Sequence, residues 1–409
     1  MAARAAAVLR LTLLLGLAAS AAAMGLFGSR KPVQQERQAI APPMGPPAPP
    51  RERVATGDPV VLDRADVMRT VEMDGRPVRE LEGNARVLHH GRVFTFGLGR
   101  YDQAAGVLSC TGAVRVVEGE RVLTADEVTY DERRETVSAR GHVHGWGDSL
   151  ETWAEKGAWY HGLKQGELQV QARVLDRRRR VELRAGQVDA DHERGVYSAT
   201  RAPVLTLQED PPTVLTARQI TWRRADSLAV ARREVRMTRE DFQATCDSLV
   251  WHDREERMDF LLKPLLTKGE RQVQGERITA LIRGRKTLDS LWVQGSARMD
   301  SPSDSVSTRL RDVLQGRRME LDFREGVLES VYVDGQARSV IFLKDERGRP
   351  GMNVADARRM WFALKDQKLE TVRMGGHMEA RWVPLREPPQ AAPPPVVPPS
   401  TAEQQEGQR

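Results

Sequence analysis

The sequence predicts an all-β protein: an elongated, two-sheeted β-jelly roll built from about eight to nine stacked strand repeats, with few helices. Two observations support this fold class. A short pattern recurs along most of the chain, with a small residue followed three and five positions later by apolar residues. Apolar and polar residues also alternate with period two between breaks at glycine or charged turns, which is typical of strands and hairpins.

The recurring pattern is clearest in LTADEVTYDERRETVSARGHV, residues 123–143. Its small residue, Ala125, has counterparts at successive spacings of 29, 31, 32, 29, 29, 41 and 41 residues: Ala154, Ala185, Ala217, Cys246, Gly275, Gly316 and Ala357. A second block, LDSLWVQGSA, recurs as LESVYVDGQA and LETVRMGGHM at spacings of 40 and 41 residues. Such regular spacing identifies a structural repeat whose units contact only their neighbours.

Each repeat also shifts its strand parity at one place. Leu123 and Ala125 share a strand face, whereas Val128 and Tyr130 share a face that is offset by an odd step. The same shift recurs in the later units. It predicts a bulge or corner where each strand crosses between the sheets, with a small residue where backbones approach closely.

The N-terminus predicts export from the cytoplasm. Residues 1–23 contain Arg4 and Arg10, then an uncharged run from Leu11 and an alanine-rich end, as in a secretory signal peptide. The uncharged residues 11–29 could alternatively form an N-terminal membrane anchor. Both alternatives place the bulk of the chain outside the cytoplasm.

The rest of the chain divides by composition. Residues 24–57 and 384–409 are Pro-rich and are expected to form a disordered linker and a disordered tail. Between them we expect a jelly roll at 58–299, a candidate inter-jelly-roll loop at 300–313, and a continuation or second jelly roll at 314–383. The 63 basic and 57 acidic residues make a mixed surface without a basic, aromatic-rich block, so no nucleic-acid partner is predicted.

The motifs L-x-A-D-E-x-x-Y and V-x-A-x-G-x-V in residues 123–143 resemble the OstA/LptA-type lipopolysaccharide-transport family, which includes LptC-like proteins and the N-terminal domain of LptD. LEGNARVLHHG (from Leu81) and VLSCTGAVRVV (from Val107) fit the same motifs more loosely, and the resemblance extends over about Val60 to Trp382. Later units depart from the pattern by replacing the acid with arginine, as at Arg218.

The resemblance implies a periplasmic protein with an incompletely closed jelly roll. Its apolar groove would shield the acyl chains of lipopolysaccharide, or of a related lipid, during transport to the outer membrane. Each CH₂ group exposed to water costs ~0.8 kcal/mol, so a continuous groove removes a large penalty without chemistry. Other jelly-roll transport components would pair with the edge strands near Val60–Val71 and Met374–Trp382, and head-to-tail self-assembly would use the same edges.

The apolar positions of the repeat are expected to line this groove. The predicted lining residues are Val128, Tyr130, Val137, Trp159, Ile220, Trp222, Leu249, Trp251, Ile278, Met319, Met360 and Phe362. An ordinary packed core is the alternative for any one of them, and a structural or adhesive β-fibre is the corresponding alternative function. Arg224, two residues after Trp222, is expected to face solvent.

No catalytic residue, cofactor or metal site is predicted. Four acids at one repeat position raise the alternative of a glycan-active β-solenoid enzyme, but they lie in different units, whereas such chemistry needs two carboxylates at one bond. They are Asp126, Glu155, Asp247 and Glu276.

Three other groups of residues are interpreted structurally. His142 and His144 form a candidate metal pair, but a solvated strand face is favoured because no third ligand is evident. The run Asp176–Arg180 could meet phosphate, although a solvated edge is favoured. Cys110 and Cys246 lie about four units apart, beyond the ~7 Å between Cα atoms that a disulfide allows, so two free, largely buried thiols are predicted.

Overall fold

The computed structural model describes residues 60–160, 163–284, 287–303, 309–365 and 368–385. The predicted signal peptide or anchor, the linker at 24–57 and nearly all of the predicted tail lie outside the described residues. All regular structure in the described ranges is β-strand, which confirms the predicted fold class. These ranges contain no helix of the length and apolarity needed to cross a bilayer.

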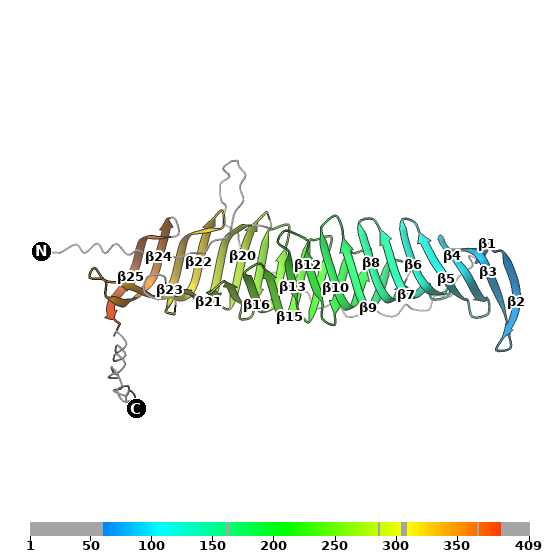
Figure 1. Cartoon of the computed structure of the whole chain (residues 1–409), viewed down its shortest axis with the longest axis horizontal. Helices are drawn as coiled ribbons and strands as arrows, with labels where there is room; N and C mark the ends of the chain where they lie inside the picture. Colours follow the sequence, from blue (N-terminus) through cyan, green and yellow to red (C-terminus); the bar gives the residue numbers. More distant parts are fainter. Residues whose placement is uncertain (1–59, 161–162, 285–286, 304–308, 366–367, 386–409) are drawn as a thin grey trace, which may run out of the picture.

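The N-terminal part of the molecule is a meander in which consecutive long strands pair antiparallel and add along the long axis (Figure 1). A 29- to 31-residue repeat is therefore one pair of strands. The long strands are β3 (Arg76–His89), β4 (Arg92–Asp102), β5 (Val107–Glu118), β6 (Arg121–Asp131), β7 (Thr136–Gly147), β8 (Leu150–Tyr160), β9 (Gln165–Asp176) and β10 (Val181–Asp191). The short strands β1 (Val61–Arg64) and β2 (Val67–Met73) both pair with β3 at the end of the array.

The predicted corner is confirmed in the middle of each long strand. The pairing of β6 with β7 shifts register between Thr124 and Glu127, and alternate strands carry two successive residues of positive φ at this point. On β7 these are Gly141 (φ 73°) and His142 (φ 45°). The corner divides every strand between two walls: wall 1 contains residues 121–125 of β6 and wall 2 contains residues 127–131. The two layers are thus one continuous folded sheet.

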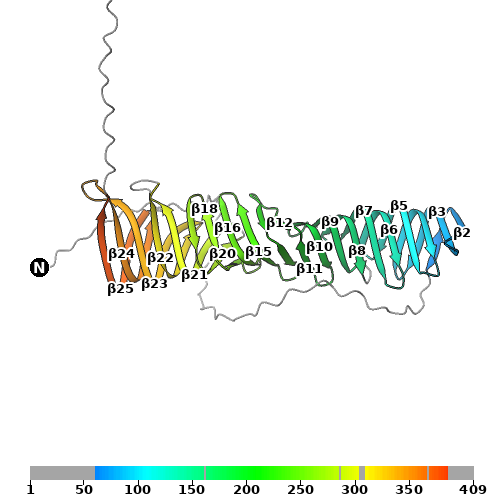
Figure 2. The ribbon, with the colours of Figure 1, turned by 90° about the horizontal axis from the view of Figure 1, so that it is seen from below.

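In the middle of the molecule, several strands are interrupted at the corner instead of bulged. Both β11 and β12 pair with β10, so together they occupy one position in the array, which stays continuous through this stretch (Figure 2). The strands here are β11 (Val196–Thr200), β12 (Val204–Leu207), β13 (Thr213–Thr216), β14 (Gln219–Arg223), β15 (Leu228–Arg239), β16 (Phe242–His252), β17 (Arg257–Leu261), β18 (Leu265–Lys268), β19 (Arg271–Gln274) and β20 (Arg277–Arg283).

The C-terminal strands are the longest, in keeping with the 41-residue spacing of their repeats. They are β21 (Thr287–Pro302), β22 (Arg311–Arg324), β23 (Val327–Lys344), β24 (Pro350–Lys365) and β25 (Lys368–Pro384). The candidate break at 300–313 contains the connection between β21 and β22, and these strands pair up to Pro302 opposite Arg311. The sheet therefore continues across this connection.

The core lies between the two walls. On β6, Leu123 and Ala125 of wall 1 and Val128 and Tyr130 of wall 2 are buried, whereas Glu127 is exposed. The small residue before each corner has a steric cause. A Cβ added to Gly316 would lie 2.5 Å from the Cγ1 atom of Val333 on the next strand, which no real contact allows.

Candidate functional site

The predicted lining residues all lie in the interior. All twelve are buried, with exposed fractions from 0% for Val137 to 6% for Trp251. All twelve also belong to wall 2, because they follow the corner on their strands or, like Val137, pair with residues that do. The pattern in the sequence thus identified one wall of the interior.

Sequence analysis missed the facing wall. Its buried side chains stand two positions before the small residue of the repeat, on the other side of the corner, as at Leu123, Leu183, Leu215 and Leu314. The shared strand face of Leu123 and Ala125 was the pattern from which these wall 1 residues could have been predicted. Together the two walls enclose an apolar interior that extends from β3 to β25.

The walls meet again opposite the corner through their hairpin turns. Rim 1, at the ends of wall 1, comprises turns 89–92, 118–121, 147–150 and 176–181. Rim 2, at the ends of wall 2, comprises turns 131–136, 191–196 and 223–228 and the described residues 160 and 163–165 between β8 and β9. Polar contacts join the rims at three places along the N-terminal half.

The first place of contact centres on Tyr130. Its hydroxyl lies 2.7 Å from Nδ1 of His89 and accepts a hydrogen bond of 3.0 Å from Arg92. Burial raises the pKa of Tyr130 to about 12. Beside it, Glu135 contacts His90 at 3.1 Å and Arg92 at 3.6 Å.

The second place of contact involves Leu163 of rim 2. Its backbone N–H donates to Oε2 of Glu118 at 2.6 Å, and its carbonyl accepts from Arg121 at 3.2 Å. Both rim 1 residues belong to the connection between β5 and β6, so a single turn bonds both backbone groups of Leu163.

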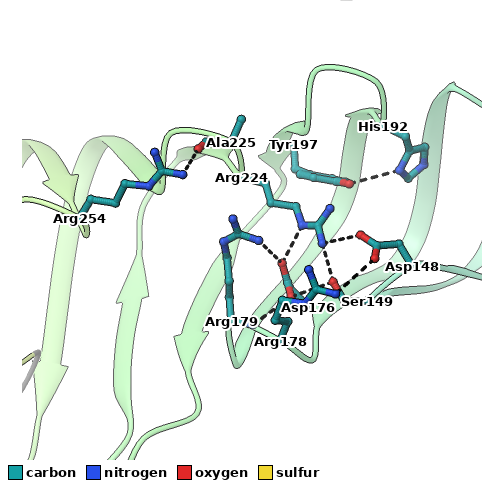
Figure 3. Close-up of polar contacts among 10 residues, drawn as sticks. All are labelled: Asp148, Ser149, Asp176, Arg178, Arg179, His192, Tyr197, Arg224, Ala225 and Arg254. Carbon is teal, nitrogen blue, oxygen red and sulfur yellow. Dashed lines mark hydrogen bonds and ion pairs between the residues drawn. The ribbon is translucent and has the colours of Figure 1, made fainter.

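The third place of contact is built on Arg224 and is called the clasp here (Figure 3). From rim 2, Nε of Arg224 donates to Asp176 at 2.8 Å, and Nη2 donates to Asp148 at 2.9 Å and to the Ser149 hydroxyl. Arg179 adds a second ion pair to Asp176 at 3.3 Å. The expectation that Arg224 faces solvent is therefore wrong: its side chain is only 19% exposed, because two acids of rim 1 bind it.

The acids of the clasp have shifted pKa values. The hydrogen bond from Arg224 lowers the pKa of Asp148. Burial opposes ionisation of Asp176, but hydrogen bonds from the Arg179 backbone and from Arg224 outweigh it and lower the pKa of Asp176. Both acids are therefore charged at neutral pH.

Two hollows lie on either side of the clasp. The larger has a volume of about 500 Å³ and lies between the second contact and the clasp. Leu123, Trp159 and Leu163 contribute apolar surface to it, and Lys164 and His192 contribute polar groups. The smaller, of about 30 Å³, lies beyond the clasp and is lined by residues that include Trp222, Trp251 and Arg179.

The histidines of β7 have separate structural environments. His142 is exposed and pairs with Asp126 at 2.8 Å across the corner. His144 stacks on Trp153 with ring centroids 5.0 Å apart, and Arg173 covers Trp153 at 4.5 Å. The described part of the chain contains no group of three or more residues that could hold a metal ion.

The remaining candidate residues also take part in structural contacts. Asp126, Glu155 and Asp247 lie on different strands, β6, β8 and β16, and Glu276 precedes β20, so the four acids do not converge on one bond. The run 176–180 is the turn from β9 to β10 and not an edge, and Arg177 pairs with Glu151 at 2.5 Å.

The cysteines are free, as predicted. Cys110 on β5 is buried, and Cys246 on β16 is half-buried. Burial raises the pKa of the Cys246 thiol to about 11 and raises that of Cys110 further. Both thiols are therefore protonated and unreactive at neutral pH.

Comparison with known proteins identifies the family. Residues 99–285 match the model described as "LptA/(LptD N-terminal domain) LPS transport protein". This segment is similar to LptA and to the N-terminal domain of LptD. The family resemblance predicted from the motifs is confirmed, and the lipopolysaccharide-transport role of that family applies to this segment at family level.

One solved structure similar to this chain is LptH of Pseudomonas aeruginosa, described as the LptA homologous periplasmic component of the conserved lipopolysaccharide transport device. It is 19% identical, and the match covers 31% of this chain and 84% of that chain with a TM-score of 0.24. A search of curated proteins gives no match.

Proposed function

We propose that the protein is a periplasmic lipid conduit whose interior shields the acyl chains of lipopolysaccharide, or of a related lipid, during transport to the outer membrane. The observation that supports this proposal is the uninterrupted apolar interior between two walls that share one corner. The backbone ladder joins the walls at the corner, whereas side chains and a few backbone groups join the rims. Separation of the rims would expose the interior along its length without breaking the sheet.

The energetics favour this use of the interior. Each acyl CH₂ group that leaves water contributes ~0.8 kcal/mol, so a chain of a dozen groups gains on the order of 10 kcal/mol. Rim contacts between partly exposed ions contribute about 0–1 kcal/mol each. Loss of a pair made by a buried ion such as Asp176 costs about 3–5 kcal/mol, which the chain's gain can still offset. The family match at residues 99–285 supports the same role.

A structural β-fibre is the second candidate, and the complete burial of the predicted lining residues favours it. A photoreactive p-benzoylphenylalanine at position 222 distinguishes the two. Trp222 is 4% exposed in the interior, whereas Arg236, on the next strand β15, is exposed and serves as the control position. A conduit should crosslink lipopolysaccharide in cells from position 222 only. Crosslinking at both positions, or at neither in a folded protein, would leave the fibre as the better account.

We further propose that the array ends bind other jelly-roll transport components or a second copy of this chain. Ten large apolar side chains are exposed in the described ranges, and eight of them lie on β1, β2 and β25, at opposite ends of the molecule (Figure 1). Met68 and Met378 are 60% and 57% exposed.

A proline on β25 tests this proposal. Val372→Pro should weaken the association of the array end with its partner while the rest of the array stays folded. Loss of all β-structure in that variant would refute the edge assignment.

The domain limits follow from the same proposal. We propose residues 58–299 and 314–383 as one continuous roll, because β21 and β22 pair antiparallel up to Pro302 opposite Arg311 within residues 300–313. Residues 1–23 would deliver the protein to the periplasm as a signal peptide, or residues 11–29 would anchor it to the inner membrane.

A further inference from the structure

The larger hollow lies beside buried side chains of the interior. It lies between two contacts that join the rims, the Leu163 contacts with Glu118 and Arg121 on one side and the clasp on the other. Its lining includes Trp159 and Leu123, buried side chains from opposite walls. Its volume of about 500 Å³ lies within the range of small-molecule sites, which are mostly apolar with few polar groups.

The clasp is the boundary of this hollow that can move most easily. Arg224 and Asp148 line the hollow and also form the clasp, so motion of Arg224 changes the width of the hollow directly. Within each wall, by contrast, the strands are held together by backbone hydrogen-bond ladders. Rotation of one arginine side chain breaks no ladder hydrogen bond.

We propose that this hollow is a lateral port at which an acyl chain of an amphiphile enters the interior, and that Arg224 controls its width. The proposal rests on the conduit function. The chain would lie against Leu123, Trp159 and Leu163, and its polar head would stay at the rim.

The charges at the rim indicate which part of the lipid is recognised. Arg121, Lys164 and Arg224 face Glu118, Glu120 and Asp148 around the hollow, so the two signs balance. Lys164 also pairs with Glu193 at 2.8 Å. A balanced rim selects neither an anionic nor a zwitterionic head, so the apolar chain is the recognised group. Dodecyl phosphate and dodecylphosphocholine should therefore compete for the port within about threefold of each other.

The rate at which the purified full-length chain binds cis-parinaric acid tests the port. Arg224→Gln removes both ion pairs that Arg224 makes in the clasp, and Arg224→Gln with Asp176→Asn also removes the charge of the buried acid, which the single variant leaves paired with Arg179 alone. Both should accelerate binding at least threefold. Leu150→Trp, which fills part of the hollow, should slow binding at least fivefold. Arg218→Ala removes an ion pair of 2.7 Å between Arg218 and Glu234 at the corner and should leave the rate unchanged.

The possible results distinguish failure of the port proposal from failure of the conduit function. Wild-type rates in the clasp variants and in Leu150→Trp would overturn the port, and lipid crosslinking from position 222 would then still support the conduit. Equal acceleration by Arg218→Ala would also overturn it, because general loosening would explain the effect. Absence of crosslinking from position 222 with normal cis-parinaric acid binding would refute the conduit function and leave a port for small amphiphiles.

Discussion

The same repeat has walls of different length at the two ends of the array. In β4, wall 1 pairs Arg92–Thr95 and wall 2 pairs Leu98–Asp102 with β5, so the walls are nearly equal. In β23, wall 1 pairs Ala337–Lys344 with β24, whereas wall 2 pairs only Ser330–Asp334. Most of the residues that lengthen the repeat spacing from 29 to 41 therefore enter wall 1 and its turn at 345–349, although wall 2 of β23 also pairs with β22 as far as Val327. The corner is the constant part of the repeat, and wall length is the variable part.

If the corner is constant, substitution of equivalent corner glycines in the two regions should lower stability equally. Gly141 and Gly335 both have positive φ, and an added Cβ would lie 2.3 Å from Oδ2 of Asp126 and 2.9 Å from Cβ of Arg317, respectively. Gly141→Val and Gly335→Val should each lower the free energy of unfolding by about 2–3 kcal/mol. Urea denaturation measures both values, and a silent variant at either site would break the equivalence of the corners.

The pH dependence of the free energy of unfolding should arise mainly at the N-terminal rims. Burial, with the positive charge of Arg121, lowers the pKa of His192 to about 4. Unfolded histidine titrates near 6.5, so the unfolded chain binds more protons between about pH 4 and 6.5 and stability falls as the pH falls through this window. The loss should be about 2 kcal/mol, and His192→Gln should remove it. Identical pH profiles of the free energy of unfolding in the two proteins would contradict this assignment.

Tyrosine hydroxyls should matter at the N-terminal rims and little on the C-terminal outer face. Tyr130→Phe leaves His89 and Arg92 without their shared buried partner and should cost about 1–1.5 kcal/mol. Tyr332→Phe, on the half-buried outer side of β23, should change the free energy of unfolding by less than about 0.5 kcal/mol. Equal effects in urea denaturation would show that the rim contact at Tyr130 does not stabilise the fold.

The smallest expected effect is a gain in stability. Val170 on β9 occupies the corner position that Gly335 occupies on β23, with φ 61° and a side chain that is 44% exposed. A β-branched residue is strained in this conformation. Val170→Gly should therefore stabilise the protein by about 1 kcal/mol, partly offset by the entropy of the unfolded chain, and should raise the melting temperature. A lower melting temperature would show that the corner of β9 is not strained.

Most of the fold could be predicted from local patterns. The parity shift after Ala125 correctly predicted the corner, and the period-two alternation correctly placed residues such as Ile220 and Trp222 in the interior. The facing wall was missed because its residues precede the corner and follow the opposite strand parity, as Leu123 does relative to Tyr130.

By itself, the sequence determined the strands, the corner of each strand and the face that is buried. The direction of a side chain along a strand depends only on the residues next to it in the sequence. Tertiary structure decided which turns meet. Arg224 contacts Asp176, 48 positions earlier, and Asp148, 76 positions earlier, because the twist and stagger of the folded sheet bring turns of different repeats together. The period of the repeat in the sequence does not indicate this stagger. The clasp, the hollow beside it and the burial of Arg224 therefore exist only in the assembled roll.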